Sequence, residues 1–280
     1  MYIADKIKTA EEKYLEALEE FFKSRWCDTF LPSHDISHHI RVWNYSKELL
    51  EYISGYGSPC ICPDPEKLLI ACCLHDLGMA ENNGIRHGMQ SSRLCRQFLL
   101  ENNLAPAKFR DVVYAIRYHD RKDHEYTEGK YDLMTLLNAA DDLDAFGITG
   151  IYRYAEICLT RGISFGSLGS VILKSAGERF LNFETVFGKS GEITVIHRQR
   201  YLVLKDFYNS YNIKSKECDF NGPPEGECGV IRIISEMITE RIPPENILSH
   251  PEKLMGDDFI FKFFRCLYGE VKSGNGYSNK

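Results

Sequence analysis

The stretch Leu68-Leu-Ile-Ala-Cys-Cys-Leu-His75-Asp76-Leu-Gly78 places an imidazole and a carboxylate directly after a run of apolar residues. The run predicts a buried helix that ends near Gly78. Neighbouring residues on a regular helix point about 100° apart, so His75 and Asp76 can face one ion only where the helix ends or bends. A buried carboxylate is costly unless it is paired or bound to a metal. We therefore expect a metal site at the end of this helix.

Other predicted helices also carry a His or an Asp on their apolar face. Three- and four-residue steps align such groups with apolar side chains at His38 within 35–53, at His119 within 106–119, and at Asp141 and Asp144 within 131–146. Singly, each group is more often a satisfied core residue, a helix cap or a solvated charge. Several that converge would be costly together, and a metal removes that cost. Imidazole nitrogen and carboxylate oxygen suit zinc, iron, manganese and similar ions.

Helical periodicity recurs along most of the chain. The predicted helices span residues 10–24, 35–53, 65–76, 87–102, 106–119, 131–146, 148–161, 166–184, 194–211, 227–241 and 257–268. Alternation around Gly188 and Gly191 also allows one short hairpin between Val186 and Val195. We therefore predict an all-α fold. Its expected parts are an N-terminal helix in 1–29, a central domain over 30–185, a helical C-terminal extension over 186–272 and a flexible tail over 273–280.

Composition narrows the range of functions. The 280 residues carry a formal charge of −6, a pI near 5.9 and 44% hydrophobic residues. This usage is that of a globular protein with a large core, and it excludes a disordered chain. The acidic balance argues against bulk nucleic acid as a partner. A phosphorylated substrate would need a local source of positive charge, which a metal ion provides.

Two features bear on the compartment. Charges interrupt the N-terminal region and no stretch is apolar over about 18 residues, so we expect no signal peptide, no membrane span and a cytoplasmic location. Ten cysteines without CxxC spacing predict reduced thiols. Cys218 and Cys228 flank a Gly- and Pro-rich loop within 215–229, where a crosslink or a metal clip is the alternative.

These residues, in this order, resemble the HD-domain metal-dependent phosphohydrolase superfamily, whose signature is a His, an adjacent His-Asp and a distant Asp. Residues 38–42 (HHIRV) match the H-x-x-R-V form with His38 as ligand. The doublet is His75-Asp76, and Asp141 in AADDLDAFG (139–147) matches the D-x-L-D-A-x-G form. The resemblance covers residues 30–185. It implies an all-α HD domain in which His38, His75, Asp76 and Asp141 bind a divalent metal ion.

Neighbouring residues leave two of these ligands ambiguous. His39 adjoins His38, and His34 lies one helical turn earlier, so the first ligand has rivals. Asp142 raises the same question beside Asp141, although the L-D-A-x-G register selects Asp141.

Two further histidines bear on the number of metals. In the binuclear branch of the superfamily, histidines in the segments of His87 and His119 hold a second metal, whereas in the mononuclear branch comparable histidines can face substrate. One or two ions per chain are therefore both open, as is their identity among Mn, Mg, Ni, Co, Zn and Fe. The Gly-Tyr-Pro motif that follows a His-His doublet in cyclic-dinucleotide esterases is absent, which disfavours that substrate class.

The resemblance implies hydrolysis by a metal-activated water. Asp76 would bridge the ion and the water, while Glu81, His119 or Asp144 would take the proton. A structural alternative for Asp144 is to order a neighbouring Arg or Lys. The candidate phosphate-binding residues are Arg86, Arg117, Arg121 and Lys122, each of which is as readily an ordinary surface charge.

We therefore expect a phosphohydrolase that acts on a nucleotide or another small phosphate ester. A di-iron oxygenase on the same scaffold and a non-catalytic nucleotide sensor are the alternatives. The sequence leaves the oligomeric state open.

Overall fold

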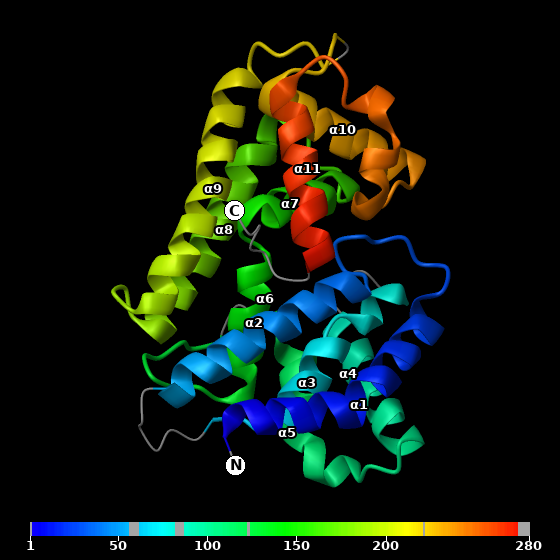
Figure 1. The fold of residues 1–280 in the computed structure, drawn as a ribbon, viewed down its shortest axis with the longest axis vertical. Helices are drawn as coiled ribbons and strands as arrows, with labels where there is room; N and C mark the ends of the chain where they lie inside the picture. Colours follow the sequence, from blue (N-terminus) through cyan, green and yellow to red (C-terminus); the bar gives the residue numbers. More distant parts are fainter. Residues whose placement is uncertain (1, 56–61, 82–86, 122–123, 221, 274–280) are drawn as a thin grey trace. The chain divides into compact units, whose positions relative to one another are not determined.

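The computed structural model describes residues 2–55, 62–81, 87–121, 124–220 and 222–273, and within them it contains helices and no strand (Figure 1). The α-helices are α1 (Ile3–Trp26), α2 (Ile36–Gly55), α3 (Pro65–Leu74), α4 (His87–Glu101), α5 (Arg110–Tyr118), α6 (Leu133–Asp144), α7 (Gly147–Thr160), α8 (Phe165–Phe187), α9 (Glu192–Lys214), α10 (Gly226–Glu240) and α11 (Asp258–Ser273). The short 3-10 helices are η1 (Leu77–Ala80), η2 (Pro106–Phe109), η3 (Pro244–Ser249) and η4 (Pro251–Lys253). The predicted all-α class is confirmed.

The short hairpin that the sequence allowed between Val186 and Val195 does not form. Helix α8 continues to Phe187, and Val186 and Phe187 are buried in its last turn. Gly188 follows with a φ of 76°, the left-handed conformation that commonly ends a helix. Gly191 then precedes α9, which begins at Glu192. The two glycines therefore separate two helices, and the alternation between them is too short to form strands.

Contacts within the chain define two compact units. Unit 1 is Met1–Leu143 with Thr185–Gly188, and unit 2 is Asp144–Glu184 with Lys189–Lys280. The division therefore falls inside α6 and again inside α8, whereas the sequence suggested a boundary near residue 185. The predicted tail lies beyond the described residues from 274 onward.

Helix α3 is the centre of unit 1. Its apolar run from Leu68 to Leu74 is completely buried, because α1, α2 and α5 all pack on it (Figure 1). A run of this kind, apolar on every side, is what a helix surrounded by other helices requires. The chain leaves α3 at His75, so the doublet emerges at the end of the most buried helix of the unit.

Two glycines let the helices around this end approach closely. A Cβ on Gly78 would collide with the backbone of α4 at His87 and Ser91, and the Gly78 N–H donates to Ser91 Oγ at 2.8 Å. A Cβ on Gly88 would lie 2.8 Å from the carbonyl oxygen of Arg117 in α5. The starts of η1 and α4 and the end of α5 therefore meet at one place.

In unit 2, α8 and α9 run antiparallel. The rings of Phe180 and Tyr201 stack at 4.5 Å, and Arg198 pairs with Glu184 at 2.7 Å. Helices α9, α10 and α11 all pack on α7 (Figure 1). No described helix has the length and apolar character needed to cross a membrane. Cys218 and Cys228 are both free thiols.

Candidate metal centre

The structure brings histidine and aspartate side chains together in unit 1 from the ends of several helices. The contributing positions are His34 just before α2, His38 in α2, His75 and Asp76 after α3, His87 at the start of α4, His119 and Asp120 after α5, and Asp141 in α6. Helices α2, α4 and α5 all pack on α3, which is why their ends converge. Asp141 of α6 approaches the same place, 4.0 Å from His75 at the end of α3. We refer to these eight residues as the His/Asp cluster.

One group of donors lies where α2, α3 and α6 meet. His38 Nε2 is 3.5 Å from Asp141 Oδ1, and His75 Nε2 is 4.0 Å from the same oxygen. The rings of His38 and His75 are completely buried. One ligand atom from each of the three residues lies within 4.8 Å of the other two, so a single ion placed between them could be bound by all three.

A second group lies where α4 and α5 meet. His87 Nε2 and His119 Nε2 are 3.4 Å apart, and Asp120 Oδ2 is 3.7 Å from His87 Nε2. Atoms bound to one tetrahedral ion at about 2.0–2.1 Å are separated by about 3.3 Å, so the spacing of the two imidazole nitrogens suits a shared metal.

Asp76 lies between the two groups, and each of its carboxylate oxygens faces one of them. Oδ2 is 3.5 Å from His75 Nε2 and 4.0 Å from His38 Nε2. Oδ1 is 3.0 Å from His119 Nε2 and 3.3 Å from His87 Nε2. A carboxylate placed in this way can bridge two neighbouring ions.

Backbone carbonyls orient the imidazoles. The carbonyl oxygen of Cys72 accepts from Nδ1 of both His39 and His75, each at 2.9 Å, and the carbonyl of Ile116 accepts from His119 Nδ1 at 2.8 Å. The hydrogen of a neutral ring then resides on Nδ1, and Nε2 of His75 and His119 presents an electron pair to the cluster. Such outer hydrogen bonds are the usual way in which a metal-binding histidine is held.

The atoms of the cluster fit a cation. His75 Nε2 is buried and has no hydrogen-bond partner among the described residues. Its electron pair faces carboxylate oxygens of Asp76 and Asp141, an arrangement that is repulsive until a positive charge lies between them. The donors are nitrogen and oxygen, as divalent ions of the first transition row require.

Burial and neighbouring charges set the protonation states. Burial lowers the pKa of His75, and it lowers the pKa of His39 to about 3, so both rings are neutral. Burial alone would raise the pKa of Asp76, but the hydrogen bonds of His119 and His87 hold it well below its usual range. Burial opposes protonation of His119 too, yet the hydrogen bond and charge of Asp76 raise its pKa. Asp76 is therefore an ionised donor.

The residues that the sequence predicted as proton acceptors or phosphate ligands have surroundings that differ from those of the metal-binding candidates. Asp144, in unit 2, forms a buried ion pair with Arg153 at 3.0 Å between Oδ2 and Nη1. Glu81 is exposed and accepts a hydrogen bond from Gln90. The guanidinium groups of Arg117 and Arg121 both lie against the Tyr118 ring. Arg86 and Lys122 lie outside the described residues.

Two members of the cluster had weak signals in the sequence. The sequence offers His34 only as an alternative to His38, but its Nε2 lies 3.8 Å from Asp76 Oδ2. The four-residue step between the two histidines could have suggested that they act together. Asp120 is not among the ligands predicted from the sequence, although it directly follows His119. By contrast, His39 is turned toward Phe22 and the Cys72 carbonyl.

Comparison with known proteins agrees with this picture. A family model described as HD domain matches residues 35–145, which include every member of the His/Asp cluster except His34. No curated protein and no solved structure matches the chain significantly.

Proposed function

Because residues 35–145 form an HD domain, the fold of a superfamily of metal-dependent phosphohydrolases, we propose that this protein hydrolyses a nucleotide or another small phosphate ester. The observation that supports the proposal most is the position of Asp76, whose two oxygens face two separate groups of imidazoles. This arrangement suits two metal ions that share one carboxylate.

Each ion would have its own set of ligands. His38, His75 and Asp141 would hold the first ion together with Asp76. The second would be held by His87 and His119, again with Asp76, and Asp120 lies within reach of it. When bound, divalent cations polarise phosphoryl oxygens and acidify water.

The residues of the chain would supply the remaining parts of the reaction. Ionised Asp76 and Asp141 balance the charge of the ions, and neutral His75 remains a donor because burial lowers its pKa. The carboxylate of Asp120 is one-third exposed, which makes it the described member of the cluster best placed to pass a proton to solvent. Asp144 and Glu81 are less suited to this step, since Arg153 and Gln90 already engage them.

Hydrolysis is tested with the full chain, stripped of metal and reloaded with Mn, Co, Ni, Mg, Zn or Fe. We expect release of phosphate or pyrophosphate from at least one member of a nucleotide panel. Asp141→Asn should abolish the release, and His250→Ala is the matched control because His250 is a partly exposed histidine of unit 2 that pairs with Glu252. If no metal supports turnover of any nucleotide or sugar phosphate, the proposal is wrong.

A di-iron oxygenase is the second candidate, because six of these side chains could hold two irons: His38, His75, Asp76, His87, His119 and Asp141. Anaerobic loading with Fe(II) followed by exposure to oxygen separates the two functions. An optical change that depends on oxygen and on His87 would favour the oxygenase. One ion per chain, or an unchanged spectrum, would exclude it. A non-catalytic sensor would instead bind nucleotides without turnover, and would still bind them after His75→Ala.

A further inference from the structure

A stripe of charged and aromatic side chains follows one face of α5 away from the metal centre. Asp111, Tyr114, Tyr118 and Arg121 succeed one another at steps of three and four residues. The rings of Tyr114 and Tyr118 meet edge to face at 4.7 Å, and the Arg121 guanidinium lies 4.6 Å from the centre of the Tyr118 ring. The stripe therefore leads from Arg121, next to the His/Asp cluster, toward the start of α5.

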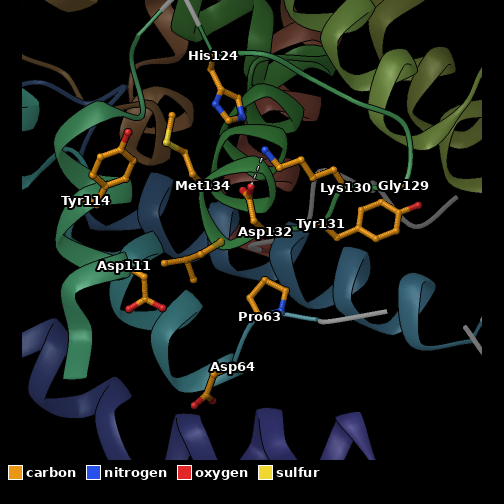
Figure 2. Close-up of a pocket in the computed structure, with 11 residues that line it drawn as sticks. Pro63, Asp64, Asp111, Tyr114, His124, Gly129, Lys130, Tyr131, Asp132 and Met134 are labelled. Carbon is orange, nitrogen blue, oxygen red and sulfur yellow. Dashed lines mark ion pairs between the residues drawn. The ribbon is translucent and has the colours of Figure 1, made fainter. Parts of the chain in front are cut away.

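A cavity of about 730 Å³ lies at the far end of this stripe. Figure 2 shows Asp111 and Tyr114 on the wall formed by α5, with Asp132 and Met134 on the side of α6 and His124 beyond them. Its volume is within the range of about 300–1,000 Å³ found for small-molecule sites. Because Tyr114 and Asp111 belong to both features, the cavity and the stripe form one continuous surface.

The charges at the two ends of this surface have opposite signs. The cavity is lined by the carboxylates of Asp64, Asp111 and Asp132. The ammonium of Lys130 is 3.3 Å from Asp132 and that of Lys67 is 2.8 Å from Asp111, so three carboxylates face two ammonium groups and this end keeps a net negative charge. The other end carries Arg117 and Arg121, both exposed. A ligand with phosphates at one end would therefore place them at the arginines and its uncharged part in the cavity.

The cavity also offers a ring for stacking. Tyr114 is 56% exposed, so most of its ring remains available. The other tyrosine of the lining, Tyr131, already stacks on Phe187 at 5.5 Å. A nucleobase presents a flat face to such a ring, and its N–H groups can donate to carboxylates along the wall.

We propose that this cavity binds the base of a nucleotide whose phosphates lie at Arg121 and the metal centre. The inference rests on the proposed function and adds to it the position and chemistry of the specificity site. Tyr114 and Arg121 are seven residues apart, which is about two helical turns or 10.5 Å of helix rise on one face, so one extended nucleotide can reach both ends. Stacking on Tyr114 would hold the base, and the carboxylates of Asp111 and Asp132 would favour bases that carry an amino group.

Binding is tested first, without reference to turnover. Adenosine, guanosine, cytidine and uridine are titrated into the metal-loaded full chain by calorimetry. We expect the nucleosides with an exocyclic amino group to bind, and Tyr114→Ala to raise their Kd about tenfold, or about 1.4 kcal/mol, within the range known for stacking. Tyr114→Phe should restore binding. Phe261→Ala is the matched control, because Phe261 is a similarly exposed aromatic residue on α11 of unit 2.

Kinetics separate this inference from the proposed function. We expect Tyr114→Ala to lower the ratio of kcat/KM for nucleotides to kcat/KM for ribose 5-phosphate about tenfold, and Phe261→Ala to leave that ratio unchanged. Equal turnover of nucleotides and ribose 5-phosphate by the natural chain would overturn the base site while leaving the hydrolase intact. Nucleoside binding that depends on Tyr114, with no turnover of any substrate, would overturn the hydrolase alone. Binding of phenethylamine in place of nucleosides would show that the cavity takes a cation, and would also overturn the inference.

Discussion

The carboxylate of Asp76 lies 3.0 Å from Nε2 of His119, whose other ring nitrogen already donates to a backbone carbonyl. A neutral ring in this position would direct an electron pair at a carboxylate. The contact is therefore favourable only with a positive charge at Nε2, which a proton or a metal ion can supply. The raised pKa of His119, which prevails over the lowering effect of burial, reflects the same demand.

Removal of metal should accordingly destabilise the protein. Stripping the ions leaves the carboxylates of Asp76 and Asp141 facing imidazole electron pairs, so the native state loses what binding had contributed. A metal present at 100 times its Kd adds about 2.7 kcal/mol. We expect chelation to lower the Tm by several degrees in calorimetry and metal to restore it. In Asp141→Asn the shift should shrink or vanish, and an identical Tm with and without metal would contradict the assignment.

Substitutions in the two groups should remove different ions. His38→Ala removes a donor of the first group, and His87→Ala removes a donor of the second. Elemental analysis should show two ions per chain in the natural protein and one in each variant. Asp76→Asn weakens both metal positions, so this variant should retain less metal than His38→Ala or His87→Ala. His250→Ala should keep both ions. Retention of all bound metal in His87→Ala would place that histidine on the substrate side instead.

We expect Asp144 to contribute to the stability of the fold and not to metal binding. It is completely buried and pairs with Arg153 inside unit 2, so Asp144→Ala removes this carboxylate from a buried guanidinium. Breaking a pair of this kind typically costs about 3–5 kcal/mol. We expect a large drop in the midpoint of urea unfolding at unchanged metal stoichiometry. The double variant Asp144→Leu with Arg153→Met should recover much of the loss. Loss of metal in a folded Asp144→Asn variant would contradict this prediction and would indicate that Asp144 contributes to metal binding.

The start of α11 should make stability depend on acid pH. Asp257 accepts hydrogen bonds from the backbone N–H groups of Gly226 and Phe259, both at 2.7 Å, and the bond from Gly226 is the main cause of its lowered pKa. A pKa depressed by folding adds stability above the ordinary value of about 3.9, and that contribution is lost as the pH falls through the lower native value.

Asp257→Ala should therefore lower the free energy of unfolding by about 1 kcal/mol at pH 7, as loss of a helix cap does. The difference from the natural chain should narrow below pH 4, measured by urea unfolding. Asp206→Ala, at an exposed position on α9, is the control. A difference that stays constant down to pH 2 would show that the carboxylate charge plays no part.

Helix ranges could be predicted from the periodic pattern of apolar residues, whereas the surroundings of individual polar residues could not. The helix ranges were predicted well because buried residues such as Tyr14, Leu18 and Phe21 recur at four- and three-residue steps, which is a helical period. The position of Asp144 could not be predicted in this way. Asp141 and Asp144 share a face of α6 at a three-residue step, and the division between the units falls between Leu143 and Asp144, which periodicity does not record. One carboxylate thus faces imidazoles and the other faces Arg153.

The cavity could not be predicted from the sequence for a related reason. Its walls come from the starts of α3, α5 and α6 together with the segment 124–131, which has no periodic pattern. Tyr114 reads in the sequence as a surface residue of α5, and its exposed fraction agrees with that. Its place beside Met134 depends on tertiary packing between helices that are distant in the chain.

The shared carbonyl of Cys72 orients one ring of the metal centre, His75, and one ring beside the centre, His39, which has a consequence for how both tolerate mutation. Two imidazoles owe the position of their hydrogens to a main-chain atom, which every amino acid provides. The thiol at residue 72 is therefore replaceable as far as these tautomers are concerned, and the path of the last turn of α3 is not. The orientation of the two rings therefore depends on the backbone path at the end of α3. A substitution that changes this path would misorient both rings at once, although it replaces neither histidine.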